Sequence, residues 1–184
     1  MLIMKITTTP LEGVIVIEPD MFEDNRGFFL ETFHQQKYKE MGIDRQWVQD
    51  NVSFSMKGVL RGLHFQVKKP QAKLVQALQG EIYDVVVDLR RDSPTFKKSF
   101  SILLTGTCMT QMFIPEGFAH GYCVISKNAL FAYKCSEFYS PSDEGGLLWS
   151  DPEIGIEWPF FNPILSPKDQ KLPRLSEFPE NWLA

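Results

Sequence analysis

The stretch Ala72-Lys-Leu-Val-Gln-Ala-Leu-Gln-Gly-Glu-Ile-Tyr-Asp-Val-Val-Val-Asp-Leu89 decides the fold class of this chain. Two runs within it, 72–78 and 81–89, are rich in apolar and β-branched residues and have the length of ordinary strands. The residues between them, Gln79 and Gly80, match a tight hairpin turn, in which glycine readily adopts a positive φ. The stretch therefore predicts two antiparallel strands joined directly to each other.

Strand signals of the same kind recur on both sides of this stretch, separated by turn residues. Apolar residues alternate over 100–104, which predicts a strand with one buried face. The segment 34–41 is the one clear helix signal, and Gly42 is placed to end that helix. We expect the strands 47–55 and 59–66 to pair with each other. The remaining predicted strands cover 13–19, 27–33, 110–115, 121–126 and 129–139.

About ten strands and one short helix in 184 residues predict an all-β fold with a closed or double-sheet antiparallel architecture. A jelly-roll barrel fits best, because closure removes exposed strand edges and leaves an open mouth for a ligand. The segment 151–184 is rich in Pro and Trp, and we expect it to wrap the barrel as a tail with short helices. We predict one domain over 1–184, with its barrel core at about 11–150.

The composition argues against several kinds of partner. The net charge of −4 gives no general attraction to the phosphate backbone of nucleic acids. No apolar run is long enough to cross a bilayer. The three cysteines, Cys108, Cys123 and Cys135, are odd in number and lack C-x-x-C spacing, which is typical of a reduced protein in the cytoplasm. We therefore expect neither a nucleic-acid partner nor a membrane partner.

Two segments resemble the paired motifs of cupins, a family of small jelly-roll barrels; they cover 58–66 and 115–120. Metal-binding cupins draw a His-x-His, a glutamate and a further histidine from these motifs. Here His64 and His120 are present, but Gln66 stands in place of the second histidine. The expected glutamate is missing, and a cation, Lys73, follows. Because a transition metal needs three or four converging donors, we predict a cupin-like barrel that holds no metal.

Side chains suited to acid–base chemistry fall in the same segments. Arg61 and His64 lie on or beside one predicted strand, and Lys73 begins the next. Tyr133 lies in a further strand, and Asp169 lies in the tail. Together they provide an imidazole, a carboxylate that can orient it, an ammonium group and a phenol.

Longer motifs extend this pattern over about 11–169. They are Asp24-x-Arg26-Gly27-x-Phe29-x-Glu31, Gln49-Asp50-Asn51, Val59 to Gln66, Gln71-Ala-Lys73, Gly80 to Leu89, Ile114 to Gly121, Tyr133-Lys-Cys135, Ile154 to Pro159 and Leu165 to Asp169. In their order and spacing these motifs resemble the dTDP-4-dehydrorhamnose 3,5-epimerases of deoxysugar biosynthesis. The resemblance covers nearly the whole chain, and several long motifs in register make it specific.

The resemblance implies a dTDP-linked 4-keto-6-deoxyhexose as substrate and inversion at C3 and C5 through enolates. Such a reaction needs a base on one face of the sugar, an acid on the other and a donor to the enolate oxygen. His64 matches the base, Asp169 its orienting partner, Tyr133 the acid and Lys73 the group that stabilises the enolate oxygen. No metal and no other cofactor is implied.

The resemblance also implies how the substrate is bound. Arg26 and Arg61 match residues that clamp the two phosphates. Phe29 and Glu31 match a segment that reaches the nucleotide across a dimer interface, which implies a homodimer. The other matching substrate-binding residues are Gln49, Asn51, His120, Tyr139, Glu144 and Lys168.

The residues leave several alternatives open. Related enzymes on the same barrel invert C3 without C5, or move the ketone between C3 and C4. A metal-dependent cupin isomerase or dioxygenase and a non-catalytic sugar-binding cupin are further alternatives. Tyr139 competes with Tyr133 for the acid role, and Asp169 would also suit the first turn of a helix. Arg26 and Glu31 would also serve as a plain surface ion pair.

Overall fold

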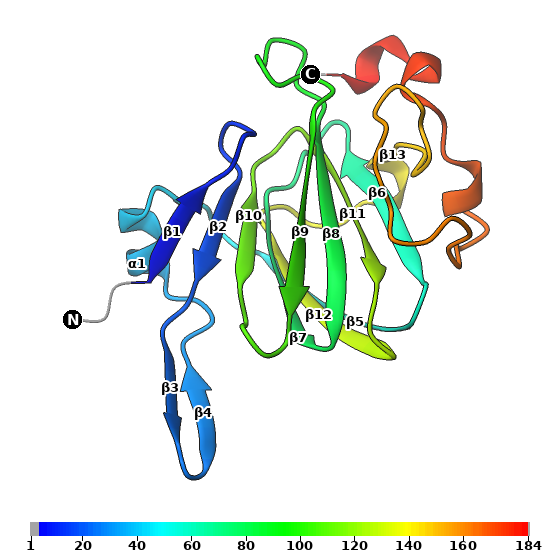
Figure 1. Cartoon of the computed structure of the whole chain (residues 1–184). Helices are drawn as coiled ribbons and strands as arrows, with labels where there is room; N and C mark the ends of the chain where they lie inside the picture. Colours follow the sequence, from blue (N-terminus) through cyan, green and yellow to red (C-terminus); the bar gives the residue numbers. More distant parts are fainter. Residues whose placement is uncertain (1–3, 184) are drawn as a thin grey trace.

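The structure, a computed structural model, describes residues 4–183. Most of the chain forms two antiparallel sheets that face each other across a shared core (Figure 1). The six-stranded sheet has the order β1 (Lys5–Thr8), β2 (Ile15–Glu18), β10 (Gln111–Ile114), β7 (Lys73–Gln79), β12 (Asn128–Cys135) and β5 (Gln49–Met56). The five-stranded sheet has the order β13 (Glu144–Gly146), β6 (Leu60–Gln66), β11 (Phe118–Val124), β8 (Glu81–Asp88) and β9 (Ser99–Thr105). The predicted all-β, double-sheet barrel is confirmed.

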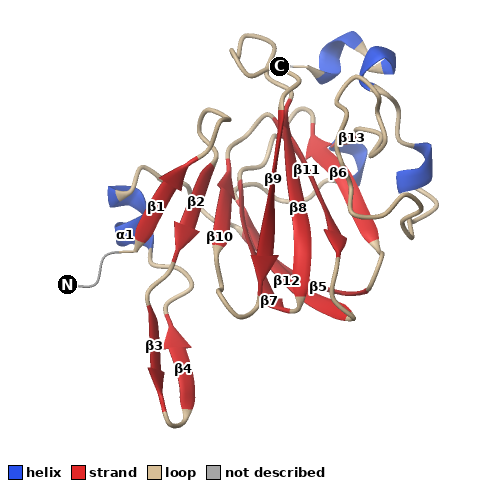
Figure 2. Ribbon diagram, in the orientation of Figure 1, coloured by secondary structure: helices blue, strands red, loops and turns tan. Residues whose placement is uncertain are grey.

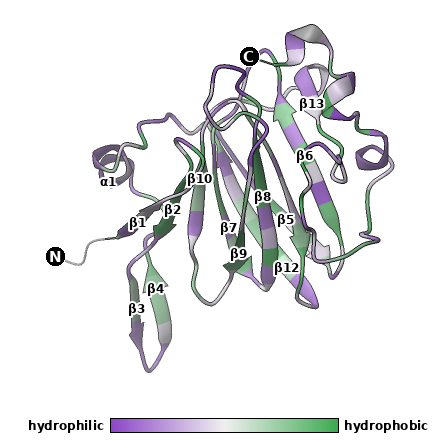
Figure 3. Cartoon of the chain, turned by 45° about the horizontal axis from the view of Figure 1, so that its top comes forward, coloured by the Kyte–Doolittle hydropathy of each residue, from purple (hydrophilic) through white to green (hydrophobic). Residues whose placement is uncertain are grey.

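The core between the sheets takes side chains from both of them. Val75 and Phe131 of the six-stranded sheet pack in one cluster with Val86 and Tyr122 of the five-stranded sheet, and none is more than 4% exposed. Full burial of a Val or Phe side chain stabilises a fold by about 1.5–3 kcal/mol. Figure 3 shows apolar residues concentrated in the strands, with polar residues in many of the connecting loops.

The tail after residue 150 covers the other face of the five-stranded sheet. Val85 and Val87 of β8 pack there with Leu175 and Trp158 of the tail, whereas Val86 points into the barrel. β8 is therefore buried on both faces, which explains its continuous apolar run. None of the described helices is long and apolar enough to span a membrane. As predicted, the helices of the tail are short (Figure 2); they are η2 (Asp169–Lys171), η3 (Leu175–Glu177) and η4 (Glu180–Trp182).

The N-terminal part adds one helix and a projecting hairpin. Helix α1 (Gln35–Glu40) begins after His34, whose ring accepts a hydrogen bond from the backbone N–H of Lys37. It ends near Gly42, whose φ of 88° suits the position after a helix. The hairpin of β3 (Met21–Asp24) and β4 (Gly27–Leu30) extends away from both sheets (Figures 1 and 2). It exposes Phe22, Phe28 and Phe29.

The predicted hairpin between β7 and β8 is wrong. β7 pairs with β10 and β12, whereas β8 pairs with β9 and β11, so Gln79 and Gly80 connect the two sheets. The predicted pairing of β5 with β6 is also wrong, because these strands lie in different sheets. Gly80 has a φ of 78°, and a Cβ there would lie 2.1 Å from the carbonyl oxygen of Asn128. Glycine permits this corner as readily as a hairpin turn, so the local sequence does not distinguish them.

Candidate active site

Two adjacent strands of the five-stranded sheet carry the histidines of the site. β6 and β11 run antiparallel, and His64 lies directly opposite His120. Gly62 and Gly121 let the two backbones approach closely, since a Cβ on Gly62 would lie 2.6 Å from the Cα of Gly121. β11 already begins at Phe118. His120 therefore lies within a strand. The prediction that this strand starts at residue 121 placed its first residue three positions too late.

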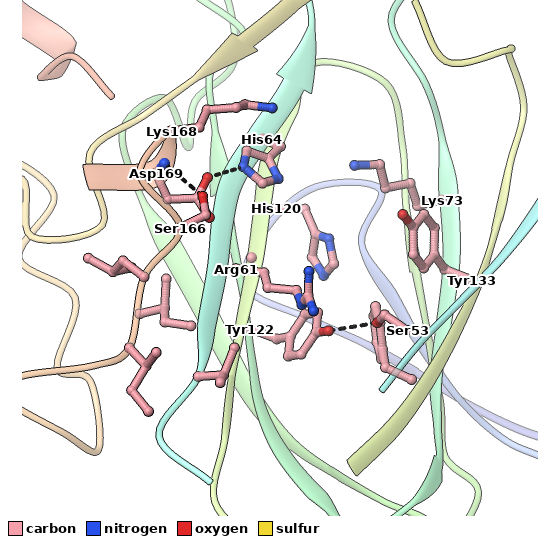
Figure 4. A pocket seen from close by; sticks show the side chains of 16 residues that line it. Ser53, Arg61, His64, Lys73, His120, Tyr122, Tyr133, Ser166, Lys168 and Asp169 are labelled. Atoms are coloured by element: carbon pink, nitrogen blue, oxygen red, sulfur yellow. Dashed lines mark hydrogen bonds and ion pairs between the residues drawn. The ribbon is translucent and has the colours of Figure 1, made fainter. Parts of the chain in front are cut away.

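His64 forms a hydrogen-bonded pair with Asp169 of the tail (Figure 4). The Nε2 of His64 lies 2.6 Å from Oδ1 of Asp169, which is 4% exposed. The backbone N–H of Asp169 donates to the hydroxyl of Ser166 over 3.0 Å, which holds the backbone at the residue that carries the carboxylate. Burial is the largest influence and would raise the pKa of Asp169, but the interactions with His64, Ser166 and Lys168 together outweigh burial and lower the pKa. Asp169 is thus an ionised hydrogen-bond partner of the imidazole, and its predicted role in orienting the ring stays a prediction.

Lys73 and Tyr133 lie across the cavity from this pair (Figure 4). Both come from the six-stranded sheet: Tyr133 on β12 pairs with Val75 of β7, which makes it a diagonal neighbour of Lys73. Burial lowers the pKa of the Lys73 ammonium, although nearby acidic groups oppose the shift. Burial also raises the pKa of Tyr133 to about 12. Tyr133 is therefore protonated at neutral pH and available as an acid.

His120 is paired with Asp84, a residue that the sequence reasoning missed. The His120 Nε2 lies 2.9 and 3.1 Å from the two carboxylate oxygens of Asp84, which is fully buried on β8. Burial raises the pKa of Asp84, whereas His120 and Lys73 oppose this shift. The signal in the sequence was one carboxylate inside the apolar run 82–87. The pair fixes the His120 ring at the wall of the cavity.

Two adjoining cavities surround these groups. The first measures about 420 Å³ and the second about 250 Å³. His64, Lys73 and Tyr133 line both cavities, so they stand where the two meet. Of the other predicted site residues, the first cavity is lined by Arg61, His120, Lys168 and Asp169, and the second by Gln49, Asn51, Tyr139 and Glu144.

The first cavity has further polar groups. The guanidinium of Arg61 donates from Nε to the Ser55 hydroxyl over 3.0 Å. The hydroxyls of Tyr122 and Ser53 lie 2.7 Å apart (Figure 4). Sequence reasoning missed Ser53 and Tyr122, because a serine and a tyrosine in a strand carry no signal of their own. Together these side chains offer a cation and hydroxyls to the oxygens of a ligand.

The second cavity has a connected polar rim. Gln49 donates to Asn51 and accepts the backbone N–H of Tyr139, both over 2.9 Å. The hydroxyl of Tyr139 donates to Glu144, which also forms an ion pair with Lys168. Burial is the largest influence and would raise the pKa of Glu144, but its bonds with Lys168 and Tyr139 and the nearby positive charges together outweigh burial and lower the pKa. Because the Tyr139 hydroxyl is engaged with Glu144, Tyr133 is the better candidate for the acid.

The structure does not bring three predicted binding residues to either cavity. Arg26 and Phe29 line a separate hollow on the hairpin, where Arg26 pairs with Asp24. Glu31 pairs instead with Lys37, over 2.7 Å. Arg26 and Glu31 thus do not pair with each other, and the interpretation as one surface ion pair is wrong. Within one chain these residues lie outside the candidate site.

The donor set of the site does not favour a metal ion. Among residues 4–183, no group of three or more His, Cys, Asp or Glu side chains is arranged to hold one. His64 and His120 each face a carboxylate of their own. The amide of Gln66 is bonded to backbone groups of nearby loops.

The fold and the site define a class of protein: a cupin-like barrel in which an imidazole–carboxylate pair faces an ammonium group and a phenol. Such a set is suited to acid–base chemistry beside a carbonyl group. Residues 8–177 match the family described as dTDP-4-dehydrorhamnose 3,5-epimerase. The chain belongs to this family.

Individual relatives agree with this assignment. The dTDP-4-dehydrorhamnose 3,5-epimerase of Shigella flexneri is 50% identical over 168 residues, which cover 90% of this chain and 93% of the relative. A crystal structure of a dTDP-6-deoxy-D-glucose-3,5-epimerase from Legionella pneumophila, in complex with dTDP-4-keto-L-rhamnose, superposes with a TM-score of 0.95. That structure is 44% identical in sequence and covers 98% of this chain and 97% of its own. A dTDP-4-dehydrorhamnose 3,5-epimerase from Bacillus anthracis with TDP and PPi bound has a TM-score of 0.91 at 45% identity, covering 94% of this chain and 99% of its own.

Proposed function

We propose that this protein is an epimerase that inverts C3 and C5 of dTDP-4-dehydro-6-deoxy-D-glucose to give dTDP-4-dehydro-L-rhamnose. One observation carries the proposal: His64 projects from one sheet and Tyr133 from the other, into cavities that both residues line. A sugar ring between the sheets then meets a base on one face and an acid on the other. Inversion of a carbon requires this arrangement, because the proton must leave one face and return to the opposite face.

The proposed reaction starts at the carbon next to the ketone. His64 takes the proton from C3 or C5, and the electron pair moves to the C4 oxygen to form an enolate. Lys73 stabilises this oxygen by charge and hydrogen bonding. Tyr133 then donates its proton to the opposite face of the carbon as the ketone re-forms. Asp169 holds the imidazole in one tautomer and stabilises its protonated form.

Charged and polar groups on either side of these residues support the binding of a nucleotide sugar. Arg61 and Lys168 are cations of the first cavity that suit the diphosphate. Tyr139 is half-exposed at the second cavity and offers a stacking face, beside the amides of Gln49 and Asn51. Glu144 and His120 complete the set of proposed contacts with the sugar.

We infer a homodimer from the three remaining residues. Arg26, Phe29 and Glu31 lie on or next to a hairpin that projects from its own chain (Figure 1). Phe29 is 70% exposed, and Phe22 and Phe28 are at least half exposed. An exposed apolar arm of this kind marks an interaction surface. In the proposed dimer, the arm reaches the nucleotide that is bound by the partner subunit.

We propose that the protein is cytoplasmic and that the chain forms a single domain. Cys108, Cys123 and Cys135 are all free thiols, which fits a reducing compartment. The tail shares a buried cluster with the five-stranded sheet through Leu175, so barrel and tail form one folded unit.

Incubation with dTDP-4-dehydro-6-deoxy-D-glucose in deuterated water tests the function. We expect deuterium at both C3 and C5 and a product of the L-rhamno configuration, detected by NMR and mass spectrometry. Deuterium at C3 without C5 would instead support a 3-epimerase, and migration of the ketone to C3 a ketoisomerase. Binding without any exchange would support a non-catalytic sugar-binding cupin. Activity that is lost on chelation and restored by stoichiometric metal would support a metal-dependent cupin.

A further inference from the structure

The buried amide of Gln66 connects the active-site strand β6 to two loops. Its Nε2 donates to the carbonyl oxygens of Lys69, over 2.9 Å, and of Phe138, over 3.2 Å. Its Oε1 accepts the backbone N–H of Ser140 over 2.7 Å. Gln66 itself is 5% exposed. One side chain therefore satisfies three backbone groups. Two of them, at Phe138 and Ser140, lie on either side of Tyr139 and restrict the backbone there.

The segment held in this way carries residues of the second cavity. Tyr139 stands between Phe138 and Ser140, so Gln66 fixes the backbone on both sides of it. Glu144 follows at the end of the same segment and pairs with Gln66 in the register of β13 and β6. Tyr139 and Glu144 are also bonded to each other over 2.8 Å.

Asp143 ties the same loops together a second time. Its carboxylate accepts the backbone N–H groups of Lys68 and Lys69, each over 2.8 Å, and Asp143 is 8% exposed. The loop after β6 and the segment before β13 are thus joined at two points.

We propose that Gln66 is a positioning residue that places Tyr139 and Glu144 for binding of the nucleotide sugar, and that it acts on substrate affinity and not on proton transfer. The proposal rests on the proposed function, because that function assigns substrate contacts to Tyr139 and Glu144. Gln66 lies two positions after His64, at the place where a metal-binding cupin would have a histidine. The amide of this side chain serves the loops that border the cavity.

Gln111 provides a matched control. It is also a buried glutamine, 1% exposed, with three hydrogen bonds. Its Nε2 donates to the carbonyl of Thr32 over 2.7 Å and to Gln76 over 3.0 Å, and its Oε1 accepts the hydroxyl of Tyr38 over 2.6 Å. Gln111 lines neither of the two active-site cavities. Its loss therefore removes the same number of bonds without touching the proposed positioning.

The experiment compares Gln66→Met and Gln111→Met with the wild type. For Gln66→Met we expect KM for the nucleotide sugar and Kd for dTDP to rise about tenfold, the loss of roughly one net hydrogen bond, with kcat nearly unchanged. Amide hydrogen exchange in the segment 138–144 should become faster. For Gln111→Met we expect a similar loss of stability with wild-type KM and Kd.

Several results would overturn the proposal: unchanged KM and Kd in Gln66→Met, an equal rise in Gln111→Met, or a fall in kcat without a change in KM. Asp143→Ala removes the two hydrogen bonds from Asp143 to the backbone of Lys68 and Lys69, and it replaces Gln66→Met in the experiment if that variant does not fold. Asp143→Ala should also raise KM while kcat is retained. Failure of the proposed function shows separately, as a wild type without turnover. The calorimetric Kd for dTDP still decides the role of Gln66 in that case.

Discussion

At the scale of single residues, two imidazoles with the same chemistry differ in their surroundings. The His64 side chain is 29% exposed and faces Asp169, whereas His120 is 7% exposed and faces the fully buried Asp84. An imidazole that is open to a cavity and held by a carboxylate can take a proton from a ligand bound there. His64 therefore suits the role of base, and His120 suits a fixed contact with the substrate.

The sequence predicted most of this site because its members fall within long motifs. His64, Lys73, Tyr133 and Asp169 line one cavity although they are far apart in the chain. Their catalytic roles remain predictions. Asp84 was missed because a lone carboxylate in an apolar strand does not show its partner, which comes from the neighbouring strand.

Asp169 should give the protein a measurable dependence of stability on pH. Its pKa is lowered in the folded state below the ordinary 3.8, so its contribution is complete above 3.8 and is lost as the pH falls through the lower folded value. The difference in unfolding free energy between wild type and Asp169→Asn should thus be largest above pH 3.8 and shrink below it. Denaturant titrations at several pH values measure it. A difference that stays constant with pH, as expected for Gln111→Met, would contradict this prediction.

Lys73 should contribute to kcat as a donor to the enolate oxygen. Removal of one such donor costs about 2.7–4 kcal/mol, or roughly 10²–10³-fold in kcat, and we expect Lys73→Met to fall in this range. Steady-state kinetics at saturating substrate provide the measurement. Lys134→Met is the control, since Lys134 also lies on a strand of the same sheet but pairs with Asp50. A similar kcat for both variants would remove Lys73 from the reaction.

At the scale of elements, the strands were easier to predict than their partners. The predicted strand 59–66 corresponds to β6, Leu60–Gln66, and 81–89 to β8, Glu81–Asp88. Apolar runs and turn residues are local properties and mark strands well. The pairing of a strand depends on contacts with strands that are distant in the sequence, and the local sequence does not determine these contacts. The short strands β1 and β13 were missed because they have three or four residues and no apolar alternation.

The close approach of β6 and β11 should be sensitive to any side chain at Gly62. Gly62 has a φ of 122°, and an added Cβ would lie 2.6 Å from the Cα of Gly121. We expect Gly62→Ala to lose more than about 2 kcal/mol of stability, from backbone strain and overpacking together. Gly58→Ala separates these effects, because Gly58 has a φ of 80° with nothing within 4 Å. Urea unfolding should show a clearly smaller loss of stability for Gly58→Ala than for Gly62→Ala. Equal losses of stability would mean that β6 and β11 are not tightly packed at Gly62.

At the scale of the whole molecule, the proposed homodimer would complete the site of one chain with the hairpin of the other. The hairpin extends away from its own barrel (Figure 2). It exposes apolar side chains, and it carries predicted substrate contacts. A homodimer with two-fold symmetry would exchange these arms reciprocally, so each site would take residues from both subunits.

Mixing two inactive variants tests this sharing of sites. Arg26→Ala and His64→Asn should each be inactive or nearly so as pure proteins. After subunit exchange, mixed dimers contain one site with an intact Arg26 from one chain and an intact His64 from the other, so part of the activity should return. Light scattering verifies that both variants are dimers. A mixture that remains as inactive as its components would show that Arg26 acts within its own chain or not at all.

The measurement that tests the central claim most directly is deuterium uptake by the nucleotide sugar with wild type and His64→Asn. If His64 takes the proton beside the carbonyl, the wild type introduces deuterium at C3 and C5, and the folded His64→Asn variant, which still binds dTDP, introduces none. Uptake by His64→Asn at the rate of the wild type would contradict the claim, because the proton would then leave to another group.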